Sequence, residues 1–279
     1  MNVLAIEAGG AQFGLSCVRA ELDSDETAFE TRAVFASSEA RSLSRDLVIQ
    51  IDAVLSRANW TTENLDVIAV GIGPGSWTSL RIALSTAKTL AQICGCEICG
   101  VPSFAAWARA ANSCVANDRA FDTTENSFIL VTAPCRPDAI YGQIMDIEYS
   151  MCGIADVKAT GAEEVAAPPA WASRVAILNH EKLPVTVCGE ARAAVFSELL
   201  NVQQNARETN VSVESVAVAI AQLGATQLTR GESDDAMALQ PLYIGVSNAE
   251  RVANERLADK RVADELNQEQ NRALPTSTR

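Results

Sequence analysis

The chain has little of what enzymes most often use for catalysis. Among its 279 residues there is a single histidine, His180, and aromatic side chains make up only 5% of the sequence. One histidine cannot form the histidine pair of an iron or zinc site, and no serine or cysteine stands in a recognisable pattern with a base. His180 lies in a polar segment that predicts a surface loop. The sequence therefore argues against a peptidase and against a serine or cysteine hydrolase.

Long apolar runs and an excess of basic charge are also missing. No stretch approaches the roughly 18 uncharged apolar residues of a membrane span, and the first residues, MNVLAIE, lack the basic region of a signal peptide. The 22 Lys and Arg residues are outnumbered by 35 Asp and Glu residues, so the formal net charge is −13. Because nucleic-acid affinity comes mainly from clustered Lys and Arg, we do not expect the chain to hold RNA by itself. We expect a cytoplasmic protein that does not bind membranes.

Eight cysteines stand at irregular spacings, as is typical of reduced, mostly buried thiols. Cys94, Cys96 and Cys99 are close enough in sequence to be considered as a metal or redox site. A second Cys or His pair at ligand spacing is missing. We therefore predict small buried side chains here and no metal.

The segment from Val70 to Thr89, VGIGPGSWTSLRIALSTAKT, is the most informative part of the chain. It follows a short β-branched run, 65–72, typical of a strand buried on both faces. The Gly73-Pro74-Gly75 turn comes next, and Ser76 or Thr78 can cap a helix. The first N–H groups of that helix would face an anion or the backbone of a partner. An ordinary turn between strand and helix is the alternative.

Apolar periodicity predicts two successive α/β halves of the same element order. The expected strands are 2–7, 13–20, 28–36, 65–72, 96–101, 127–133, 139–147, 153–158 and 184–188, and the expected helices are 42–58, 78–94, 102–113, a helix from 191, and 213–229. We predict a first subdomain of 1–110 plus about 210–245 and a second of about 111–209. Residues 246–279 form a charged tail, either a solvated helix or a disordered segment.

The helix expected at 78–94 carries a row of small residues. Ala83, Ala87 and Ala91 recur at every fourth position, preceded by Ser79. Such a row lets another backbone approach closely, and that backbone belongs either to a partner protein or to the chain's own sheet.

The motif GPGSWTSLR resembles the GPGSFTGLR signature of the TsaB (YeaZ) family, with Trp77 in place of Phe and Ser79 in place of Gly. The segments Val101-Pro102-Ser103-Phe104 and Pro241-Leu242-Tyr243-Ile244 follow in family order, so the resemblance covers most of residues 1–245. It implies a duplicated actin-like α/β fold with two subdomains. This fold is shared with sugar kinases and Hsp70 and is also called RNase H-like.

The resemblance also implies a function. TsaB proteins take part in the N6-threonylcarbamoylation of adenosine 37 in ANN-decoding tRNAs, as noncatalytic subunits that bind and activate TsaD. TsaE joins the pair, tRNA is met only indirectly, and TsaB forms a homodimer when alone. The partner interface implied here comprises Ser76, Trp77, Thr78, Ser79, Arg81, Ala83, Ala87 and Ala91. A salt bridge within its own domain is the alternative role for Arg81.

The actin-like superfamily ends its first strand in an Asp followed by small hydroxyl residues, which position magnesium and phosphate. Here the same place reads Glu7-Ala8-Gly9-Gly10, which keeps a carboxylate but has no side-chain hydroxyl. We predict at most a degenerate nucleotide site of Glu7, Gly9, Gly10, Gly73 and Gly75. ATP or ADP with Mg²⁺ at a complex interface is the one cofactor considered. The alternative function is an ATP-dependent kinase or ATPase in which Glu7 holds magnesium.

The second half departs from the family at segment 134–139. Relatives read like Asp-Ala-Arg before a Glu-Val-Tyr strand, and of these only Arg136 and Tyr141 are kept. Pro134 cannot donate to a strand ladder, so we expect altered pairing here and transfer no binding role to the segment.

Overall fold

The computed structural model describes residues 1–22, 27–37, 42–116, 127–149, 155–179, 183–203 and 205–244. The chain divides into two compact units, Met1–Leu242 and Tyr243–Arg279. The predicted tail at 246–279 and His180 lie outside the described residues. None of the helices in the described ranges combines the length and the apolar character that a membrane crossing requires.

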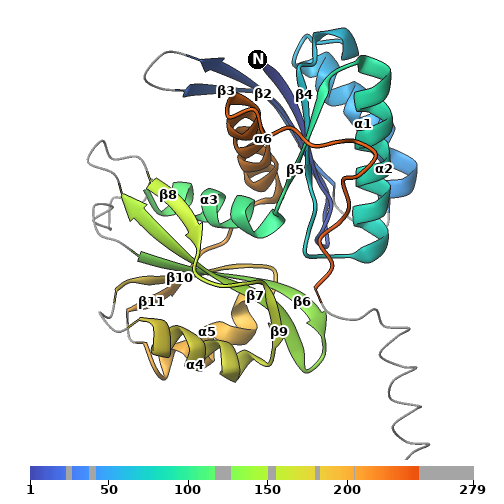
Figure 1. Cartoon of the computed structure of the whole chain (residues 1–279). Helices are drawn as coiled ribbons and strands as arrows, with labels where there is room; N and C mark the ends of the chain where they lie inside the picture. Colours follow the sequence, from blue (N-terminus) through green and yellow to red (C-terminus); the bar gives the residue numbers. More distant parts are fainter. Residues whose placement is uncertain are drawn as a thin grey trace, which may run out of the picture. The chain divides into compact units, whose positions relative to one another are not determined.

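The first half of the larger unit is built on a five-stranded sheet of order β3-β2-β1-β4-β5 (Figure 1). Strand β1 pairs antiparallel with β2 and parallel with β4. Strand β2 continues antiparallel to β3, and β4 continues parallel to β5. The elements are β1 (Asn2–Glu7), β2 (Gly14–Leu22), β3 (Thr27–Ala36), α1 (Leu43–Arg57), the 3-10 helix η2 (Thr62–Asn64), β4 (Val67–Gly71), α2 (Trp77–Cys94), β5 (Glu97–Val101) and α3 (Ser103–Ala116).

The second half repeats this arrangement. Its sheet has the order β11-β10-β6-β7-β8, with β9 paired to β7. Strands β7 and β8 are antiparallel to their neighbours, whereas β10 and β11 continue parallel from β6, as in the first sheet. The elements are β6 (Ser127–Arg136), β7 (Ala139–Tyr149), β8 (Ala155–Ala159), β9 (Glu164–Ala166), α4 (Pro168–Leu178), β10 (Val185–Gly189), α5 (Arg192–Leu200), β11 (Ala206–Glu208) and α6 (Val213–Thr229). The predicted duplicated actin-like fold is confirmed.

Alternation along β1 explains the layers around the first sheet. Leu4 and Ile6 join the cluster that includes Leu47 and Ile51 of α1, whereas Val3 and Ala5 join the cluster that includes residues of α6. Helices α1 and α2 therefore cover one face and α6 covers the other (Figure 1). Helix α3 contacts both α6 and the second sheet, so one apolar cluster extends across both halves.

The proline expected to disturb pairing in the second half does so. The register between β6 and β7 shifts between Pro134 and Arg136, which is a β-bulge. The Arg136 Nε atom lies 3.0 Å from Asp138 Oδ1 across the turn that follows.

Three short elements of the second half were not predicted. They are β9, α4 and β11. Helix α4 begins with two prolines, which fit the first turn of a helix. Only Trp171, Ala172 and Val175 of this helix are buried, too few for a strong periodic signal.

Candidate functional site

The start of α2 presents four of the predicted interface residues at the surface. Ser76 is the N-cap, and its Oγ accepts from the Ser79 amide, as predicted. Trp77, Thr78 and Arg81 are exposed on the first turn. The Arg81 guanidinium lies 4.3 Å from the centre of the Trp77 ring, a cation–π contact that orients the indole.

The small residues further along α2 do not reach the surface. Ala83, Ala87 and Ala91 are buried within the cluster that packs on the first sheet, and Ser79 is buried as well. Of the two alternatives for this row, the structure therefore shows packing on the chain's own sheet. Their small size instead lets α2 lie close to its own sheet. The surface of this layer is formed by other residues.

Large aliphatic side chains remain exposed on the same helical layer. On α1, Val48 and Ile49 are exposed, and on α2 the same is true of Ile93. The helical spacing of Leu43, Leu47, Val48, Ile51, Val54 and Leu55 predicts that Val48 lies on the core face of α1, but the Val48 side chain is 63% exposed. Val48 and Ile49 directly follow the buried Leu47, so the turn of the helix carries them away from the sheet. Exposed apolar side chains mark an interaction surface where they form a contiguous patch.

Glu7, at the end of β1, is buried and turned into the protein. Its Oε1 accepts from the Gly9 amide at 2.6 Å, and its Oε2 accepts from the Ser103 hydroxyl at 2.8 Å. A Cβ at Gly71 would overlap Oε2, so the carboxyl group fills a closed space beside β4. Burial raises the pKa of Glu7 above its ordinary value, against the lowering effect of these hydrogen bonds. The group that would hold magnesium is therefore occupied within the chain.

The glycines of the predicted nucleotide site lie where the turn after β1 packs against the turn before α2. The Ser76 amide donates to the Gly9 carbonyl at 2.7 Å, and a Cβ at Gly75 would overlap the Gly9 backbone. Gly73 has a φ of +105°, and its amide donates to the Ser103 hydroxyl at 3.2 Å. The structure thus brings Glu7 and these glycines close together.

A second carboxylate, which sequence reasoning missed, covers the turn after β1. The Glu190 Oε1 atom accepts from the Ala11 amide at 2.7 Å, and a Cβ at Gly10 would overlap the same carboxylate. Its negative charge also contributes to the raised pKa of Glu7. Phosphate is the anion that the family resemblance led us to consider at this turn. Here an anion from the second half of the chain already binds it.

Of the three clustered cysteines predicted to be buried, Cys99 is buried, whereas Cys94 and Cys96 are only partly buried. Burial raises the pKa of Cys96 to about 11 and that of Cys99 to about 12, so both thiols stay protonated. Within the described ranges, no three His, Cys, Asp or Glu side chains gather as metal ligands would.

Two sheets of matching order and a turn that joins β1 to the start of α2 define a protein of the actin-like, RNase H-like class. The family model for TsaD, tRNA N6-adenosine threonylcarbamoyltransferase, matches residues 31–121. The fold is that of YeaZ from Pseudomonas aeruginosa, with a TM-score of 0.64 and 17% identity over 87% of this chain and 99% of that chain.

A second solved structure, an uncharacterized protein with similarity to peptidase YEAZ from Pseudomonas aeruginosa, has a TM-score of 0.61 and 18% identity. It covers 88% of this chain and 99% of its own. No curated protein matches the sequence. The resemblance to the TsaB (YeaZ) family seen in the GPGSWTSLR motif is confirmed as a likeness of fold.

Proposed function

We propose that this chain is a noncatalytic subunit that binds and activates a TsaD enzyme in the N6-threonylcarbamoylation of adenosine 37 of tRNA. The observation that carries the proposal is the filled site after β1. Both Glu7 oxygens accept hydrogen bonds from the chain itself, and the nearby Ala11 amide binds Glu190. Because the chain's own groups occupy the position considered for magnesium and phosphate, we infer that the chain acts by binding a partner rather than by catalysing a reaction.

The surface that supports this role lies on the layer of α1 and α2. Its exposed residues include the aliphatic Val48 and Ile49 on α1 and, at the start of α2, the Trp77–Arg81 pair. Aromatic and arginine side chains beside apolar ones are typical of the residues that dominate binding energy at interfaces. In this proposal the same surface forms the homodimer in the absence of TsaD. TsaE joins the pair, and tRNA is met only indirectly because the chain carries a net charge of −13.

Replacing Ile49 with glutamate tests the surface. We expect the wild-type chain to retain TsaD from the same source in a pull-down. The Ile49→Glu variant should weaken that complex by about 10-fold or more, because the glutamate carboxylate would be desolvated at the interface. The matched control is Ile177→Glu on α4, since Ile49 is 62% and Ile177 is 66% exposed. Failure of folded wild-type protein to bind folded TsaD would contradict the proposed function.

An ATP assay distinguishes the alternative. We expect no magnesium-dependent ATP turnover above background from the wild-type chain, and the same background from Glu7→Gln, since the Glu7 carboxyl is enclosed. Phosphate release can be followed with and without Mg²⁺. Turnover that depends on magnesium and disappears in Glu7→Gln would favour a kinase or ATPase.

A further inference from the structure

The turn after β1 is anchored at alternate residues by side-chain oxygens. The three pairs of amide and oxygen are Gly9 with Glu7 Oε1 at 2.6 Å, Ala11 with Glu190 Oε1 at 2.7 Å, and Phe13 with Ser37 Oγ at 2.9 Å. Two of these oxygens come from the first half of the chain, whereas Glu190 belongs to the second half. A hydrogen bond to a carboxylate is stronger than one between neutral groups. Glu190 therefore ties the turn to the second half.

Glu190 is held in place by the strand that precedes it. Strand β10 ends at Gly189, which pairs with Thr132 of β6. The Arg192 Nη1 atom donates to the Gly189 carbonyl at 3.3 Å from the other side. A Cβ at Gly10 would overlap the Glu190 carboxylate, so this carboxylate lies directly against the turn. The position of the turn therefore depends on the end of β10.

The same turn holds the start of α2. The Gly9 carbonyl accepts from the Ser76 amide at 2.7 Å. Ser76 is the N-cap of α2 and directly precedes Trp77. The contact of Glu190 is with Ala11, two positions from Gly9. A single turn thus joins the end of β10 to the start of α2.

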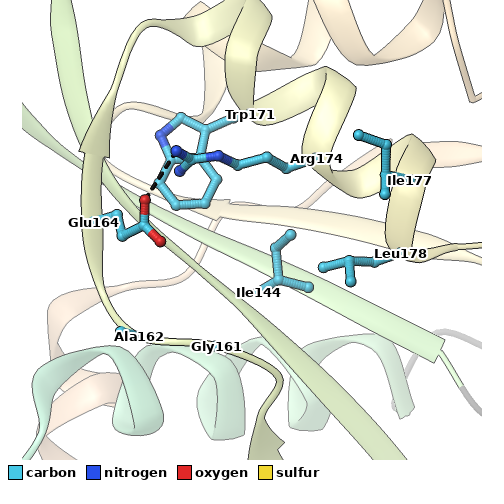
Figure 2. A pocket seen from close by; sticks show the side chains of 8 residues that line it. All are labelled: Ile144, Gly161, Ala162, Glu164, Trp171, Arg174, Ile177 and Leu178. Carbon is cyan, nitrogen blue, oxygen red and sulfur yellow. Dashed lines mark ion pairs between the residues drawn. The ribbon is translucent and has the colours of Figure 1, made fainter.

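The pocket of the second half is separate from this series of contacts (Figure 2). Its volume is 210 Å³, and residues of β7, of α4 and of the segment from Gly161 into β9 line it, among them Ile144, Trp171 and Ile177. Glu190 and the turn after β1 contribute no residue to its lining. A substitution in this pocket therefore alters the second half and leaves the contact of Glu190 in place.

We propose that Glu190 is a positioning residue for the partner-binding surface. Through the turn after β1, its carboxylate fixes the first turn of α2, which carries Trp77 and Arg81, in the orientation that the partner meets. A surface that is ordered before binding loses less conformational entropy in the complex. The second half of the chain thereby raises the affinity of a surface that lies on the first half. This inference rests on the proposed function, in which the partner is TsaD.

Hydrogen exchange measured by NMR on the full chain alone tests the contact. In Glu190→Ala the Ala11 amide loses its acceptor, and we expect the Ser76 amide to exchange about 10-fold faster than in the wild type. Glu190→Gln keeps a side-chain oxygen for the Ala11 amide and should restore most of the protection. The reference is the Ser215 amide, which donates to Ser212 Oγ at 3.2 Å at the N-cap of α6. Unchanged exchange at Ser215 distinguishes a local loosening from a loss of global stability.

Binding to TsaD tests the consequence. Glu190→Ala should raise the dissociation constant of the complex by about 3–10-fold, because the loosened start of α2 must be ordered on binding. Glu190→Gln should stay within about 2-fold of the wild type. The matched control is Glu208→Ala, which removes another carboxylate of the second half, one whose side chain is 46% exposed and lies near Arg192. This variant and Ile177→Glu in the pocket should bind TsaD as the wild type does.

Failure of the inference is distinguishable from failure of the proposed function. A folded wild-type chain that does not bind TsaD contradicts the proposed function, and the inference falls with it. If the wild type binds and Glu190→Ala binds equally well, the positioning role is overturned and the proposed function stands. Unchanged exchange of the Ser76 amide in Glu190→Ala overturns the role as well. So does an equal loss of affinity in Glu208→Ala, which would identify an effect of charge rather than of the contact with Ala11.

Discussion

Replacing Gly189 with alanine is expected to lower the free energy of unfolding by about 3–5 kcal/mol. Gly189 ends β10 with a φ of +95°, and a Cβ there would overlap the carbonyl oxygen of Thr132 on the neighbouring strand β6. The two strands are held tightly at this point, since the Thr132 hydroxyl donates to the Cys188 carbonyl at 2.9 Å. The variant therefore combines backbone strain with a clash that only a strand movement can relieve.

Gly231→Ala separates these two contributions. Gly231 also has a positive φ, +75°, but a Cβ there would meet nothing within 4 Å. We expect a loss of about 1 kcal/mol from backbone strain alone. Urea unfolding of both variants measures the difference. A loss of stability lowers the urea concentration at the midpoint, while the slope of the unfolding free energy against urea concentration stays constant. Equal losses would contradict the account of a clash with Thr132.

The Gly189 substitution also bears on the filled site. Glu190 follows directly and binds the Ala11 amide, so a displaced end of β10 would move this carboxylate away from the turn after β1. The position of the end of β10 therefore determines whether the Glu190 carboxylate binds the turn after β1.

Most of the fold could be predicted from the sequence because its signals are local. Buried strands such as β1 and β4 are short apolar runs, and Ser76 and Ser212 mark helix starts by their own side chains. The helix predicted at 213–229 coincides with α6. Two halves with the same order of elements then predict the same sheet topology twice.

The role of the small residues on α2 could not be decided in the same way. A row of Ala83, Ala87 and Ala91 permits close approach of any backbone, and periodicity does not say whether that backbone belongs to the chain or to a partner. The structure answers for the folded chain, because the row lies on its own sheet. For the exposed residues of α1 and α2, such as Ile49, the sequence pattern indicated only that they lie outside the buried face of the helix.

The contact between Glu190 and Ala11 was beyond sequence reasoning for a different reason. The two residues are 179 positions apart, and a glutamate after a strand is ordinary. Only the folded chain brings the end of β10 to the turn after β1. Glu7 was identified as a candidate from the strand end, but its enclosure by Gly71 and Ser103 depends on contacts across the sheet.

Replacing Ser103 with alanine is expected to cost about 2–4 kcal/mol at a pH above the folded-state pKa of Glu7. The Ser103 hydroxyl donates to Glu7 Oε2 and accepts from the Gly73 amide, and Ser103 is itself buried. Without the hydroxyl, a buried carboxylate loses a donor and a buried N–H loses its acceptor. The matched control is Ser16→Ala, which removes a buried hydrogen bond of 2.9 Å to the Ala217 carbonyl and should cost about 1 kcal/mol.

The two variants should differ in their dependence on pH. The pKa of Glu7 is raised above 4.5 in the folded chain, so the stability linked to its proton is fully present below pH 4.5 and is lost as the pH rises through the folded-state pKa. Loss of the Ser103 donor raises the pKa of Glu7 further. The Ser103→Ala variant therefore loses more stability than the wild type over the same rise in pH. The difference in unfolding free energy from wild type should therefore be smallest below pH 4.5 and should grow as the pH rises through the folded-state pKa of Glu7. The Ser16→Ala difference should stay constant with pH, because neither of its partners titrates. A Ser103→Ala difference that is equally flat would show that Glu7 does not carry the charge assigned to it.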